Sequence, residues 1–192
     1  MAVTYPFVTD MLRARLTAGH RVLEIGCGPK QYRPLIPGHY VGLDLPSAPS
    51  LIEPPDFACS AEHIPSPDES FDLVFGVAVF YLIGPIEQAL AECRRVLRSG
   101  GGGRLVIFDY KPHITAANKA LDPAGPARRV WEFPELAALL DNAGFIGIDD
   151  LTGTIDTAYP INARGRLRLQ ARALMGLPRT NDSWLIIEAR RP

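Results

Sequence analysis

The sequence lacks the features that mark secreted, membrane-spanning and disulfide-bonded proteins. Its three cysteines, Cys27, Cys59 and Cys93, are an odd number without C-x-x-C spacing, which argues against a disulfide framework and a zinc cluster. No apolar run approaches the roughly 20 residues that a membrane span needs, and residues 1–10 do not resemble a secretory signal. We therefore expect a cytoplasmic protein with no membrane span.

The sequence also lacks a strong charge of either sign. A net charge of −1 provides no long-range field for gathering nucleic acid, so a nucleic-acid partner is not favoured. The four histidines show no H-x-x-x-H spacing and the carboxylates form no compact cluster, so we expect no metal site. Nothing in the sequence indicates an oligomeric state.

The 192 residues suit one α/β domain over residues 1–192. Helical spacing of apolar residues predicts helices over 6–18, 86–97 and 133–143. Apolar runs predict strands, which we place at 21–25, 40–44, 57–59, 71–77, 104–108, 146–151 and 183–189. This alternation predicts a doubly wound sheet with ligands at the carboxyl ends of its strands.

A glycine turn after the first strand and an acid after the second indicate a nucleoside site. Gly26 and Gly28 let the backbone approach a ligand closely, and Asp44 can accept the hydroxyls of a ribose. Gln31 stands where a dinucleotide fingerprint has its third glycine, which argues against a pyrophosphate. Glu24 would crowd an anion but suits a ligand that has an amino group and a sulfonium.

The pattern E-x-G-x-G of residues 24–28 resembles motif I of the class I S-adenosylmethionine-dependent methyltransferases. Further segments similar to that family follow in the same order, at 59–65, 67–74, 94–101 and 131–136, and the subgroup resembled is methyltransferase type 11. The resemblance implies a Rossmann-like seven-stranded sheet whose last strand is antiparallel, and S-adenosyl-L-methionine as cofactor. The cofactor contacts that it implies are Glu24, Gly26, Cys27, Gly28, Asp44, Leu45, Ser60, Ala61 and Val77.

The sequence departs from the family at three places. Lys30 stands where many members have a third glycine, and Ser60 replaces the aspartate that usually accepts from the adenine amino group. Residues 76–82 lack the asparagine, glutamate or histidine that many members have beside the methyl donor. Cofactor binding is still expected, because these changes leave the glycine turn and Asp44 in place.

We expect methyl transfer to a small-molecule acceptor, with an oxygen acceptor favoured. The alternatives are a macromolecular (protein or RNA) methyltransferase and a non-catalytic cofactor-binding protein of the same fold. The catalytic candidates are His113, Asp109 and Tyr81. Each has a plainer alternative: an exposed loop histidine, a carboxylate that caps the next turn, and a packing tyrosine.

Two segments, at about 111–130 and 152–182, are insertions that we expect on the substrate side. The second contains Arg164, Arg166, Arg168 and Arg172 beside apolar residues at helical spacing. Such a segment predicts either a lid with a basic face for an anionic acceptor or a solvated amphipathic helix.

Overall fold

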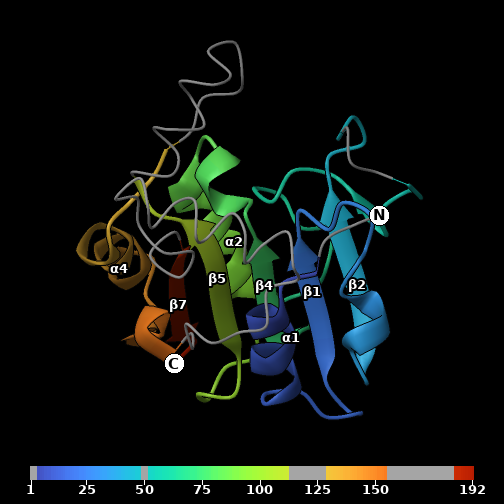
Figure 1. The fold of residues 1–192 in the computed structure, drawn as a ribbon, viewed down its shortest axis with the longest axis horizontal. Helices are drawn as coiled ribbons and strands as arrows, with labels where there is room; N and C mark the ends of the chain where they lie inside the picture. Colours follow the sequence, from blue (N-terminus) through green and yellow to red (C-terminus); the bar gives the residue numbers. More distant parts are fainter. Residues whose placement is uncertain (1–3, 49–51, 113–128, 155–183) are drawn as a thin grey trace, which may run out of the picture.

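A computed structural model describes residues 4–48, 52–112, 129–154 and 184–192 (Figure 1). Its strands form one sheet in the order β3-β2-β1-β4-β5-β7-β6. The strands are β1 (Arg21–Ile25), β2 (His39–Asp44), β3 (Phe57–Ala58), β4 (Leu73–Val77), β5 (Arg104–Tyr110), β6 (Ile146–Asp150) and β7 (Trp184–Arg190). The pairs from β3 to β5 are parallel, whereas β7 runs antiparallel to β5 and β6. This arrangement confirms the predicted Rossmann-like sheet with its antiparallel last strand.

The central strands are buried on both faces of the sheet, which explains why they are almost continuously apolar. One face packs against α2 (Ile86–Val96) and α4 (Phe133–Asn142), whose stripes include Leu90 and Leu136. The other face packs against α1 (Pro6–Arg13), which crosses the near side of the sheet in Figure 1. Short 3-10 turns complete the described elements: η1 (Arg33–Leu35), η2 (Phe80–Leu82) and η3 (Thr152–Thr154).

The first helix is shorter than the predicted span of 6–18. It ends at Arg13, and the chain then turns so that Arg15 Nε lies 2.5 Å from Glu188 Oε2, a buried carboxylate on β7. Arg104 binds the other oxygen of the same carboxylate at 2.9 Å. Arg15 and Arg104 thereby supply the partners that a buried carboxylate needs, because burying it unpaired is costly.

Strand β5 extends two residues beyond its predicted end at Phe108. Asp109 and Tyr110 continue the ladder opposite Leu185 and Trp184 of β7. Asp109 consequently lies within the strand, one residue before its end.

Candidate functional site

A cleft of about 690 Å³ opens at the carboxyl ends of β1, β2 and β4. Here the strand order reverses, because β1 has β2 on one side and β4 on the other, and such switch points are where open α/β sheets bind ligands. The cleft has the size of a small-molecule site. Every residue that the family resemblance assigned to the cofactor lines it: Glu24, Gly26, Cys27, Gly28, Asp44, Leu45, Ser60, Ala61 and Val77.

The glycine turn after β1 has left-handed backbone at Gly26 (φ 66°) and Gly28 (φ 48°). A Cβ atom on Gly26 would overlap the side chain of Val79, which follows β4 and lines the same cleft. Glycine is therefore needed at 26 for its conformation and for the close approach of Val79, besides any approach of a ligand.

Cys27 fixes this turn to the neighbouring strand. Its N–H donates to the carbonyl of Leu43 at 3.0 Å, and its side chain is buried against Gly42 of β2. Burial raises the pKa of the Cys27 thiol to about 12, so the side chain is a neutral packing group at ordinary pH.

Asp44 at the end of β2 accepts two backbone hydrogen bonds. Its Oδ2 accepts the N–H of Gly28 at 2.8 Å, and its Oδ1 accepts the N–H of Leu45 at 2.8 Å. These bonds fix the orientation of the carboxylate, and each oxygen keeps a second lone pair for a ligand hydroxyl. The half-buried position of Asp44 in the cleft suits the ribose contact that the sequence predicts.

Glu24 lies in the wall of the cleft with only 2% of its surface exposed. Its Oε2 accepts a hydrogen bond from the Tyr40 hydroxyl at 2.5 Å. Burial raises the pKa of Glu24 to about 8, against an ordinary value of 4.5. A cationic ligand group beside Glu24 would stabilise its charged form, as expected for a site that binds an amino group.

Apolar side chains form much of the remaining wall. Leu45, Ala61 and Val77 line the cleft, and so do Val79 and Ile83. Ser60 also lines it, and its hydroxyl accepts the N–H of Glu62 at 3.4 Å. Val79 belongs to the stretch 76–82 that the family resemblance places beside the methyl donor, whereas no sequence pattern indicated Ile83, since an apolar residue there is equally typical of core packing.

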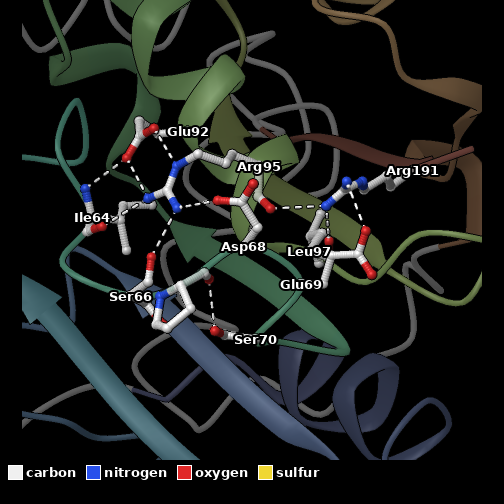
Figure 2. A network of polar contacts seen from close by, with 10 residues as sticks. Ile64, Ser66, Asp68, Glu69, Ser70, Glu92, Arg95, Leu97 and Arg191 are labelled. Carbon is white, nitrogen blue, oxygen red and sulfur yellow. Dashed lines mark hydrogen bonds and ion pairs between the residues drawn. The ribbon is translucent and has the colours of Figure 1, made fainter.

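Residues 64–68, which follow Ser60, Ala61 and Glu62 in the chain, are held against α2 by a polar network (Figure 2). Arg95 binds both oxygens of Glu92, at 2.7 and 2.8 Å, and also binds Asp68 at 2.8 Å. Its guanidinium donates further bonds to the carbonyls of Ile64 and Ser66 at 2.9 and 2.8 Å. The hydrogen bonds from Arg95 hold the pKa of Glu92 below its ordinary value.

Further contacts of Glu92 and Arg191 extend this network. Glu92 Oε2 accepts the N–H of Ile64 at 2.9 Å, which ties the segment to the helix directly. On the other side Arg191 binds the carbonyls of Arg95 and Leu97 and pairs with Glu69 at 3.1 Å. The stretch that directly follows the cleft residues Ser60, Ala61 and Glu62 is therefore anchored by charges that lie outside the cleft.

Asp109, a predicted catalytic candidate, is fully enclosed, with 1% of its surface exposed. Its oxygens accept the N–H groups of Val79 at 3.1 Å and Tyr81 at 2.9 Å. Burial raises the pKa of Asp109 to about 8. This geometry matches the alternative of a carboxylate that caps a turn, and the turn that it caps places Val79 in the cleft.

Of the other two catalytic candidates, the structure describes Tyr81 but not His113. Tyr81 is half-buried in η2, its ring makes an edge contact with Tyr110 at 5.8 Å between centroids, and its carbonyl accepts the N–H of Arg129 at 2.9 Å. His113 lies outside the described residues, as do Arg164, Arg166, Arg168 and Arg172.

Within the described ranges, no three His, Cys, Asp or Glu side chains gather in a way that would hold a metal ion. Within the same ranges, no helix is long and apolar enough to span a membrane.

Residues 23–107 match the model of a family described as a methyltransferase domain. The chain is 37% identical over 138 residues to phthiotriol/phenolphthiotriol dimycocerosates methyltransferase 1 of Mycobacterium ulcerans. That alignment covers 63% of this chain and 49% of the relative. The chain thus spans about half the length of this relative.

Solved structures share the fold at low sequence identity. A chain from the complex of the Haloferax volcanii Trm112 methyltransferase activator with a methyltransferase gives a TM-score of 0.68 at 19% identity, covering 96% of this chain and 89% of its own. A phosphoethanolamine N-methyltransferase 2 of Haemonchus contortus, solved in complex with S-adenosyl-L-methionine, gives 0.67 at 16% identity, covering 97% of this chain and 53% of its own.

Proposed function

We propose that this chain, which belongs to the class I S-adenosylmethionine-dependent methyltransferases, transfers the methyl group of S-adenosyl-L-methionine to a small-molecule acceptor. The observation that carries the proposal is the convergence of the predicted cofactor residues on one cleft at the switch point of the sheet. Their chemistry fits the cofactor: an oriented carboxylate at Asp44, an acid at Glu24, and apolar walls for the flat adenine ring.

The bound cofactor would supply an electrophilic methyl group on a sulfonium. In this chain Asp44 would bind the ribose hydroxyls of the cofactor, and the backbone of the glycine turn would lie against the cofactor. Glu24 would lie near the amino group of the cofactor. Leu45, Ala61 and Val77 would enclose the adenine ring of the cofactor and keep water from it. Holding two reactants in line can lower a barrier by roughly 7 to 11 kcal/mol without acid–base chemistry, so apolar walls are compatible with transfer.

We favour an oxygen acceptor, since the Mycobacterium ulcerans relative is named for a triol substrate. A hydroxyl acceptor must lose its proton, so a base is needed near the methyl group. The proposed base is His113, which follows β5 in the sequence, and Tyr81 is the proposed acceptor-side residue; both oxygens of Asp109 already accept backbone N–H groups. An imidazole with an ordinary pKa of about 6.5 suits this role near neutral pH.

The test is a transfer assay with cofactor that carries a deuterated methyl group. The protein is incubated with labelled cofactor and a metabolite extract, and products are examined by mass spectrometry for the label. A labelled small molecule that depends on the protein and on Asp44 supports the proposal. Label only in protein or RNA would support a macromolecular acceptor instead, and cofactor binding without any labelled product would support a non-catalytic role.

A further inference from the structure

Lys30 is a buried cation in the turn that follows the predicted cofactor glycines. Its side chain is only 4% exposed, although lysine is almost never enclosed unless it is paired. Its backbone is left-handed, with φ at 51°, a conformation that residues other than glycine and asparagine rarely adopt. A residue that is both buried and strained in this way is retained by specific contacts.

Those contacts join the turn to β2. Lys30 Nζ lies 3.1 Å from Asp56 Oδ1 and 3.6 Å from Glu53 Oε1. The second oxygen of Asp56 accepts the N–H of Gly42 at 2.7 Å, and the N–H of Asp56 donates to the carbonyl of Gly42 at 2.8 Å. The hydrogen bonds from Gly42 and Lys30 lower the pKa of Asp56, although partial burial acts in the opposite direction.

Gly42 lies two residues before Asp44 on the same strand. The Lys30–Asp56 pair is therefore one of three ties between the turn and β2, together with the bond from Cys27 N–H to the Leu43 carbonyl and the bond from Gly28 N–H to Asp44. Lys30 supplies the charge of this connection, and its side chain is not among the groups that line the cleft.

We propose that Lys30 is a positioning residue for the cofactor, which fixes the glycine turn to β2 through Asp56 and so holds Gly28 and Asp44 in binding geometry. The inference rests on the proposed cofactor site. It gives a role to the lysine that stands where many family members have a glycine: its side chain joins the turn to Asp56, which is bonded to Gly42 of β2.

The experiment measures the affinity of S-adenosylhomocysteine by calorimetry, together with the free energy of unfolding in urea. The variants are Lys30→Met, Asp56→Asn and the double variant. Arg33→Gln is the matched control, because Arg33 pairs with Glu53 at 3.4 Å on the exposed surface of the same segment. We expect Lys30→Met to weaken binding about tenfold, roughly the contribution of one charge-assisted hydrogen bond, and Arg33→Gln to leave it unchanged.

The double variant separates positioning from a purely structural role. Lys30→Met leaves Asp56 without its nearest cation, and adding Asp56→Asn removes that charge while an amide oxygen still accepts from Gly42. We expect stability to recover in the double variant while affinity stays low. The inference is overturned if wild type binds and Lys30→Met binds within twofold of it, or if affinity recovers together with stability. Absence of binding by wild type would instead remove the proposed cofactor site itself, and the inference with it.

Discussion

The side chain of Val79 occupies the space that a Cβ atom on Gly26 would fill. Gly26 begins the turn after β1, and Val79 follows β4, so the contact joins the ends of two adjacent parallel strands at the cleft. The backbone of the glycine turn and the loop after β4 thus define each other's position.

This contact predicts that Gly26→Ala reduces stability as well as cofactor binding. The added methyl group meets Val79 in a left-handed backbone, so we expect a loss of about 2 to 4 kcal/mol in the free energy of unfolding. Gly19→Ala is the control, since a Cβ atom there meets nothing within 4 Å. Urea unfolding curves that coincide for the two variants would show that the turn and Val79 are not packed as described.

Removing the Asp109 carboxylate should loosen the loop after β4. In Asp109→Ala the N–H groups of Val79 and Tyr81 lose their acceptor inside the protein, at a cost of about 1 to 3 kcal/mol for each buried donor. Asp109→Asn should cost less, because one amide oxygen can still accept. Thermal unfolding measures the stability of both variants. Equal stability of wild type and Asp109→Ala, with methyl transfer alone abolished, would assign Asp109 a direct part in the reaction.

Stability without ligand should fall as the pH rises from about 4.5 to about 8. Glu24 has a folded pKa of about 8 and an ordinary value of 4.5, so in this interval the folded state binds more protons than the unfolded state. Its buried neutral form stabilises the fold fully below this window, and that contribution is lost as the pH passes through the folded pKa.

The variant Glu24→Gln tests whether Glu24 causes this dependence of stability on pH. Asp109 has a raised pKa for the same reason, so Glu24→Gln should flatten the slope without abolishing it, while an amide oxygen still accepts from Tyr40. Urea unfolding at pH 5, 6, 7 and 8 measures the slope. A slope identical to that of wild type would show that Glu24 is already ionised in the folded protein.

Replacing Arg95 should reduce stability and S-adenosylhomocysteine binding more than replacing its neighbour Arg98. Arg95→Met removes bonds to Glu92, Asp68 and two carbonyls, whereas Arg98→Met removes one half-exposed pair with Asp72. We expect Arg95→Met to lower stability by about 2 to 4 kcal/mol and to weaken S-adenosylhomocysteine binding, because the stretch that follows Ser60 and Ala61 loses its anchor. Arg98→Met should change stability by about 1 kcal/mol or less. Comparable effects of the two substitutions on binding would contradict the role of the network.

The sheet and the cleft residues could be predicted because their signals are local. Strands buried on both faces are apolar throughout, as in Leu73–Val77, and a glycine turn and an acid at two strand ends are recognisable by their spacing. Parallel strands then bring those ends together at one edge. Asp44 and Gly28, far apart in many possible folds, consequently meet in a hydrogen bond.

The remaining features depend on partners distant in sequence. Asp109 lies inside β5 only because Leu185 of β7 pairs with it, and a sequence window around residue 109 does not contain that partner. Glu188 is likewise buried beside Arg15 and Arg104, and Lys30 beside Asp56. Such contacts leave no periodic pattern in the residues that make them.

A calorimetric titration with S-adenosylhomocysteine can decide whether this cleft binds the cofactor through Asp44. It compares wild type, Asp44→Ala and Asp149→Ala, the last of which removes an exposed carboxylate on β6. We predict that wild type and Asp149→Ala bind equally. Asp44→Ala should bind at least about tenfold more weakly, because it loses charge-assisted hydrogen bonds of roughly 1.5 to 3 kcal/mol each. Equal affinities of Asp44→Ala and wild type, or no binding by wild type, would contradict the assignment of this cleft to the cofactor.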